Sequence, residues 1–196
     1  MSKINQEIFE FFNNKETFKK TERLLDSFNE FQQELFIQFW NKLYDYIKTN
    51  LKLKNWVVEH ETYRLDYDGS YILIRHEKDN NYFLYFNIYC KSGAAGYGIM
   101  YEKESNPLNI EKLYSELQIE KYKIKEWKFG PLKKSWMPLY YELKLCVFKE
   151  PKSFERILPE LINETIKQIG DQVINDFDLD LQNYINKKLT EVGVLC

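Results

Sequence analysis

Apolar side chains recur at helical spacing through the first fifty residues. Within residues 27–50 they stand three, four and seven positions apart, and Glu30, Lys42 and Lys48 lie on the other face. Ser27 followed by Glu30 matches a capping box. The pattern predicts a helix over residues 27–50 that covers a sheet, preceded by a first helix within residues 4–20. The predicted core stripe consists of Phe28, Phe31, Leu35, Phe36, Phe39, Leu43, Tyr46 and Ile47.

The periodicity changes at Trp56 from helical to alternating or continuously apolar. Residues 71–77 and 82–90 are rich in aromatic and β-branched side chains, and the intervening "KDNN" favours a turn, so they predict an antiparallel hairpin. Three further strands are predicted in "WVVEHETYRLDY", which ends at a tight Asp68-Gly69 turn, in "GYGIMYEK", which follows a glycine turn at 93–98, and in "MPLYYELKLCVF". "NPLNIEKLYSELQ" predicts a short helix with Asn109 as its cap.

The last third of the chain predicts helices. "SFERILPELINETIKQIGDQVINDF" and "DLQNYINKKL" carry apolar stripes, with Pro159 in the first turns after Ser153, where proline is tolerated. The elements together predict a single α+β domain over residues 1–196, with a helical part at 1–50, a sheet region with a short helix at 55–148, and C-terminal helices at 152–192. Its sheet is expected to be mostly antiparallel, with about four to five strands packed by long N-terminal and C-terminal helices.

Composition narrows the classes of partner. Charged residues make up 30% of the 196 residues, but the net charge is -2, so no global field attracts nucleic acid or an anionic membrane. Three cysteines without CxxC spacing, an N-terminus without a signal-peptide pattern and the lack of a long apolar run predict a reduced cytoplasmic protein with no membrane span. Aromatic residues reach 17%, which suits either a strand-rich core or a recognition surface.

Lys91 can be compared with the lysine of a nuclease core. In PD-(D/E)XK nucleases, acidic side chains hold a divalent metal and a lysine orients water. Asp68 and Lys91 imitate that order, but Tyr89 occupies the position that requires a carboxylate, so Lys91 is expected to flank a turn. Glu142 and Lys144 restore an ExK triplet without a nearby aspartate. The chain is therefore expected not to be an enzyme, although a diverged metal-dependent nuclease stays open.

Other catalytic patterns are weaker. His60 and His76 stand beside Glu61 and Glu77, which could suggest a metal site, but two isolated histidines are more often found at a sheet surface. The chain contains no GxGxxG, Walker or GxSxG sequence. We therefore predict no catalytic residues, no metal ligands and no cofactor.

Positive charge is concentrated in one stretch, residues 121–136, against a single acid, Glu126. The candidate binding residues are Lys121, Lys123, Lys125, Trp127, Lys128, Lys133, Lys134 and Trp136. One interpretation is a solvated edge strand, because lysines keep exposed edges from pairing with other chains. The other is a surface for an anionic partner, such as single-stranded nucleic acid, a nucleotide or an acidic protein, with the tryptophans as stacking residues.

The sequences "FIQFWNKLYDYI", "AGYGIMYE" and "SWMPLYYEL" add a resemblance. Over residues 28–150 the chain resembles the C-terminal accessory region found behind PD-(D/E)XK nuclease domains in bacterial and phage proteins, without the nuclease core. The resemblance implies a free-standing accessory or sensor module in bacterial defence or phage counter-defence, and no catalytic residues carry over.

Three functions follow from these observations. The first is a noncatalytic protein-binding, sensor or inhibitor module, the second is a nucleic-acid or nucleotide binder that uses the Lys/Trp stretch, and the third is the diverged nuclease. The near-neutral charge and the abundance of Tyr and Trp favour a protein partner. The pattern leaves the oligomeric state open.

Overall fold

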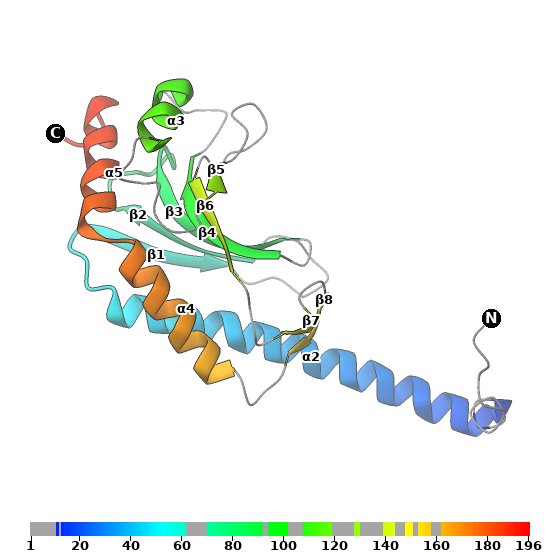
Figure 1. The fold of residues 1–196 in the computed structure, drawn as a ribbon. Helices are drawn as coiled ribbons and strands as arrows, with labels where there is room; N and C mark the ends of the chain where they lie inside the picture. The colour runs from blue at the N-terminus through cyan, green and yellow to red at the C-terminus, as the bar shows by residue number, and fades with distance from the viewer. Residues whose placement is uncertain are drawn as a thin grey trace.

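A computed structural model of the chain describes residues 13–61, 70–91, 94–101, 108–118 and 162–196, together with residue 11. It also describes four short strand segments by their backbone, at 128–129, 139–143, 148–150 and 153–157. Figure 1 shows helices packed on one face of an antiparallel sheet, with one helix extending far beyond it. The predicted α+β architecture is thereby confirmed.

The longest element is helix α2, Lys15–Asn50, which spans 36 residues or about 54 Å. It begins twelve positions earlier than the predicted start at Ser27. Asn14 provides the actual cap, because its side-chain oxygen accepts hydrogen bonds from the backbone N–H groups of Glu16 and Thr17 at 3.0 and 3.3 Å. The capping box predicted at Ser27 is therefore wrong: no glycine or proline interrupts residues 15–34, so a serine inside the helix does not end it.

The sheet has six strands, one more than the upper end of the predicted number. Each of its strand pairs is antiparallel, as predicted. Their spatial order is β1-β2-β3-β4-β6-β5, so β5 forms one edge. The strands are β1 (Trp56–Glu61), β2 (Tyr71–His76), β3 (Tyr85–Lys91), β4 (Ala94–Met100), β5 (Lys128–Phe129) and β6 (Leu139–Leu143).

The hairpin between β3 and β4 is tighter than predicted. Lys91 pairs with Ala94, and Cys90 pairs with Ala95, so the strand begins before the glycines at 96 and 98. The predicted glycine turn at 93–98 is therefore wrong beyond its first residue, because Gly96 and Gly98 lie inside the strand. Lys91 ends β3 beside the turn, as predicted. The Asp68-Gly69 turn lies outside the described residues.

The C-terminal part begins with strands before its helices. Strands β7 (Phe148–Glu150) and β8 (Ser153–Ile157) form a separate two-stranded sheet. They are followed by helices α4 (Ile162–Asp176) and α5 (Leu179–Glu191). The prediction of a helix is therefore wrong for residues 153–157, because these residues form strand β8 and pair with β7. The described helix begins after Pro159, whose ring does not fit a helix interior.

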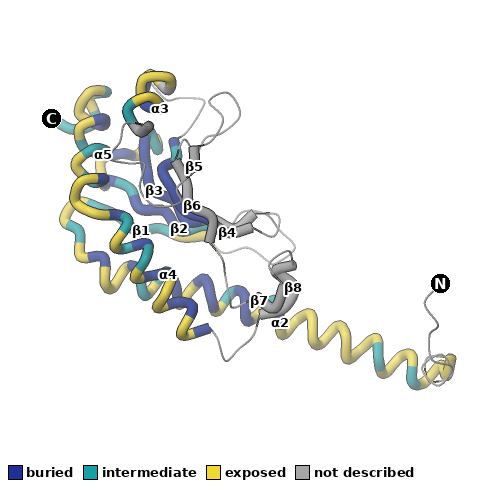
Figure 2. The backbone as a smooth tube through the Cα atoms, in the orientation of Figure 1, coloured by how far each residue is buried: buried dark blue, intermediate teal, exposed yellow. Residues whose placement is uncertain are grey.

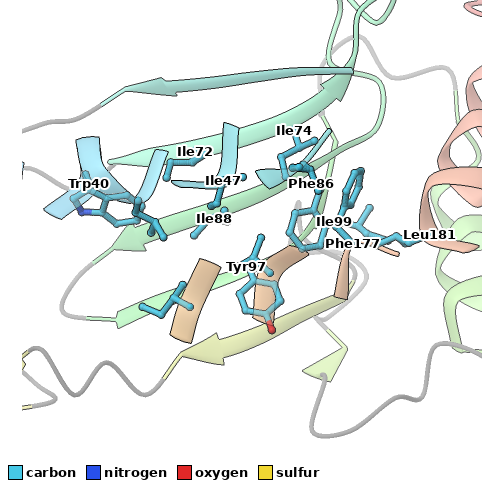
Figure 3. Packing of buried hydrophobic residues seen from close by; sticks show 14 of the residues in the cluster. Trp40, Ile47, Ile72, Ile74, Phe86, Ile88, Tyr97, Ile99, Phe177 and Leu181 are labelled. Atoms are coloured by element: carbon cyan, nitrogen blue, oxygen red, sulfur yellow. The ribbon is translucent and has the colours of Figure 1, made fainter. Parts of the chain in front are cut away.

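The predicted short helix is confirmed as α3 (Ile110–Gln118), and Asn109 caps it by accepting a hydrogen bond from the Lys112 N–H at 3.0 Å. The C-terminal half of α2 packs beside α4 over the sheet. Between these layers lies one apolar cluster, shown in Figure 3. It joins Trp40 and Ile47 of α2 to Phe86 of β3, Tyr97 of β4 and Phe177, the residue after α4. Among the described residues, no helix is long and apolar enough to cross a membrane.

Candidate protein-contact surface

Helix α2 divides into a buried half and a protruding half. Figures 1 and 2 show its first half, residues 15–31, reaching past the sheet and the other helices into solvent. We call residues 15–31 the protruding segment. At 1.5 Å per residue it is about 25 Å long. The second half of α2, by contrast, lies under the sheet and beside α4.

The protruding segment carries large apolar side chains that stay exposed. Their exposed fractions are 49% for Phe18, 70% for Leu24, 57% for Leu25, 41% for Phe28 and 49% for Phe31. In the buried half, Phe36 and Phe39 are 2% and 1% exposed. We call the first five residues the exposed stripe. Monomeric proteins seldom expose contiguous apolar side chains in this way, which makes the stripe a candidate interaction surface.

The exposed stripe lies on the same face of α2 as the core. Phe18 and Leu25 stand seven residues apart, and two further steps of seven lead through Gln32 to the buried Phe39. Likewise, Phe28 lies seven residues before the buried Leu35. One apolar face therefore runs along α2. The sheet and α4 cover its second half, and its first half extends beyond them (Figure 2).

Charged groups on the protruding segment are divided by sign along its length. Residues 15–23 hold four basic side chains and two acidic ones, whereas residues 24–34 hold three acidic side chains and none that is basic. The basic residues are Lys15, Lys19, Lys20 and Arg23, and the acidic residues of the second part are Asp26, Glu30 and Glu34. Lys20 also forms an ion pair with Glu16 one turn away, at 2.8 Å. The helix is thus basic toward its free end and acidic toward the body of the molecule.

The predicted Lys/Trp stretch falls almost wholly outside the described residues. Within it, the structure places only the backbones of Lys128 and Phe129, which form β5 and pair with Tyr140 and Leu139 of β6. Because β5 is the outer strand of the sheet, Lys128 lies at an edge. Both interpretations of the stretch, a solvated edge and an anion-binding surface, stay predictions.

The two histidines lie apart on the sheet. His60 in β1 pairs with Ile72, and His76 in β2 pairs with Trp56 of β1. Trp56 and His60 are four residues apart, so the two histidines are separated by about 13 Å along the strands. His60 stacks on the ring of Tyr44, with ring centres 3.9 Å apart. His76 is buried, and burial is the main cause that lowers its pKa. Within the part of the chain that the structure describes, no three Cys, His, Asp or Glu side chains are grouped as a metal site would require.

The nuclease-like residues are also separated or undescribed. Glu142 is in β6, where its backbone pairs with Gly96 of β4, and the same glycine pairs on its other side with Tyr89 of β3. Asp68 and Lys144 lie outside the described residues. Glu142 is described by its backbone alone, so the diverged-nuclease interpretation stays a prediction.

A polar cluster on the sheet face away from α2 has a structural role. The guanidinium of Arg75 forms an ion pair with Glu59 on the neighbouring strand at 2.5 Å, and its remaining nitrogen contacts three backbone carbonyl groups. The hydrogen bond to Glu59 is the main cause that raises the Arg75 pKa. Buried Asp79 accepts hydrogen bonds from the N–H groups of Phe83 and Leu84. These contacts hold the β2–β3 turn in place. The charged groups of Arg75, Glu59 and Asp79 are bonded to one another or to the backbone.

A hollow beside the α2–β1 turn offers local positive charge. Lys48, Lys52 and Lys54 line it together with Trp56. The Lys48 ammonium already donates a hydrogen bond to the Tyr44 hydroxyl at 2.8 Å, and this bond is the main cause that raises the Lys48 pKa. The hollow therefore presents three exposed lysines, and Lys48 among them is already hydrogen-bonded.

The exposed stripe was not identified from the sequence. The stripe predicted for residues 27–50 was assigned wholly to the core, and the structure contradicts this for Phe28 and Phe31. Phe18, Leu25 and Phe39 stand at multiples of seven residues, and this spacing is a usable signal, because it shows that the apolar face continues far before residue 27. Comparisons with protein-family models, curated proteins and solved structures find no match to this chain.

Proposed function

We propose that this chain is a noncatalytic protein-binding module, and that the exposed stripe of α2 is its contact surface. The observation that carries the proposal is the continuation of the core face of α2 into solvent. The same apolar face is 1–2% exposed at Phe36 and Phe39 and 41–49% exposed at Phe18 and Phe28. A partner that covers the stripe extends the hydrophobic core along the helix.

The physics of an isolated helix supports this function. A helix of about 17 residues is only marginally stable in water, and most helices in proteins are stabilised by packing of one apolar face. Residues 15–31 have such a face, with charged residues on the opposite side. Burying a phenylalanine or leucine side chain contributes about 1.5–3 kcal/mol. Covering the stripe therefore stabilises both the helix and the complex.

The geometry favours recognition of another helix or of an apolar groove. The side chains of the stripe recur at spacings of three, four and seven residues, which is how amphipathic helices present anchor residues to a partner. The predicted sensor and inhibitor roles are forms of such a module and stay predictions. Binding of nucleic acid through the Lys/Trp stretch is a separate prediction.

Site-specific photo-crosslinking in cells tests the proposal. A photoreactive phenylalanine analogue is placed at Phe28 in the stripe and, as a matched control, at exposed Glu30 on the charged face. We expect protein crosslinks from position 28 and few from position 30. Nucleic acid as the main product, or equal protein crosslinking at the two positions, would contradict the proposed surface.

A further inference from the structure

We infer that the exposed stripe pairs with the same stripe of a second copy of this chain, with the two helices antiparallel. This inference rests on the proposed function, because it specifies the protein that covers the stripe. It is carried by the charge division along the protruding segment. The pairing is a two-fold symmetric contact, which is the commonest form of self-association.

The charge division selects the orientation. In an antiparallel pair, the basic part of one segment, residues 15–23, lies beside the acidic part of the other, residues 24–34. The attraction occurs twice, once on each side of the two-fold axis. In a parallel pair, basic would lie beside basic and acidic beside acidic. Opposite charges flanking an apolar seam set the orientation of paired helices.

One alignment of the two helices also places apolar residues of one stripe opposite apolar residues of the other. With the two-fold axis between Leu24 and Leu25, Phe18 lies opposite Phe31 of the second copy, and Leu24 lies opposite Leu25. The same register sets Lys15, where α2 begins, opposite Glu34 at the end of the acidic part. Residues 18–31 of each copy are then paired. The globular bodies lie at opposite ends of the pair, because each body is at the C-terminal end of its own protruding segment.

The flanking charges agree with this register. Lys19 and Asp26 are seven residues apart and lie on the same side of the helix. Across the two-fold axis, Lys19 of one copy comes level with Glu30 of the other, and Arg23 comes level with Asp26. The exposed side chains of the stripe offer on the order of 1,000 Å² of apolar surface over two copies, which reaches the lower end of specific interfaces.

Sedimentation equilibrium of the full chain over a wide concentration range tests the association. We expect a reversible change from one to two copies. Leu25→Glu should raise the dissociation constant about tenfold or more, because an apolar contact is lost in both copies. Ser27→Glu adds the same charge on the exposed opposite face and serves as the matched control. Circular dichroism should show that both variants are folded.

Salt and cysteine pairing test the orientation. Added salt should weaken an antiparallel pair and strengthen a parallel one, because it screens attraction in the first and repulsion in the second. In a Cys196→Ser background, Thr21→Cys and Phe28→Cys proteins should form a 21–28 disulfide when mixed. Disulfides between identical positions, 21–21 or 28–28, would overturn the antiparallel arrangement.

The outcomes separate this inference from the proposed function. A chain that stays a single copy at high concentration overturns the inference. If Phe28 then crosslinks to a different protein in cells, the protein-binding function stands with another partner. If position 28 gives no protein crosslink and the chain stays a single copy, both fail.

Discussion

Gly170 of α4 lies directly against the ring of Tyr46 of α2. A methyl group in place of the glycine hydrogen would contact Cδ1 of that ring and lie 2.6 Å from Cε1, closer than van der Waals contact allows. The Tyr46 hydroxyl donates a hydrogen bond to Asp171 at 2.6 Å, and this bond is the main cause that raises the Tyr46 pKa. The close approach of α2 and α4 therefore depends on the absence of a side chain at residue 170.

This contact predicts that the effect of Gly170→Ala on the free energy of unfolding changes sign when Tyr46 is replaced. Gly170→Ala gains about 1 kcal/mol from helix propensity, but overpacking against Tyr46 costs about 1–3 kcal/mol, so we expect the single variant to be destabilised. In a Tyr46→Ala background the clash is absent, and the same change should stabilise by about 1 kcal/mol. Urea unfolding of the four proteins measures both effects. Equal effects of Gly170→Ala in the two backgrounds would refute the account of this contact.

Helix α2 has a buried half and a protruding half, and we predict that replacing a phenylalanine by alanine affects stability differently in the two. Phe39→Ala removes a buried ring from the core and should lower the free energy of unfolding by about 3–5 kcal/mol. Phe28→Ala is the matched control in the protruding segment. It should lower the free energy of unfolding of the isolated chain by less than about 1 kcal/mol. Thermal unfolding in dilute protein compares them. Similar losses from both variants would show that residue 28 belongs to the core.

Local pattern explains most of the fold and little of the candidate site. Alternating apolar residues predicted the central strands β2 and β3, and Asn109 predicted the start of α3. The segment 153–157 resembles the start of a helix locally, and only its pairing with β7 makes it a strand. Whether Phe28 or Phe36 is buried depends on how far the sheet and α4 extend along α2, which is tertiary information. The contact surface therefore emerges only with the fold.

Tyr97 connects the sheet to α4 through a buried phenol. Its hydroxyl donates a hydrogen bond to Asp176 at 2.5 Å, although the two residues are 79 positions apart. Tyr97→Phe keeps the ring and removes this bond to a carboxylate, so we expect a loss of about 1.5–3 kcal/mol in unfolding free energy. Chemical denaturation measures the loss. A change below about 0.5 kcal/mol would mean that the hydrogen bond contributes nothing net.

The ion pairs of Lys188 in α5 predict a dependence on pH. Lys188 is buried and forms ion pairs with Glu116 at 2.5 Å and Glu191 at 2.9 Å. Burial lowers the pKa of Lys188, but its hydrogen bonds to the two carboxylates outweigh this and raise it overall. The hydrogen bond from Lys188 lowers the pKa of Glu191 below its ordinary value of 4.5.

The sign of the effect follows from these directions. A lowered Glu191 pKa contributes stability above about pH 4.5 that is lost as the pH falls through the folded-state pKa. Wild type should therefore melt higher than Glu191→Gln at about pH 7, and the difference should disappear as the pH falls through the lowered pKa of Glu191. A difference that persists unchanged at low pH would exclude this ion pair as its source.

Amide hydrogen exchange in residues 15–31, followed over about a hundredfold range of protein concentration, tests the central claim most directly. An uncovered segment of this length should exchange fast, and pairing with a second copy should slow it. We predict that exchange in 15–31 slows as concentration rises, while residues 35–47, which already lie in the core, exchange slowly throughout. Exchange in 15–31 that is the same at every concentration would contradict the pairing of two copies through this segment.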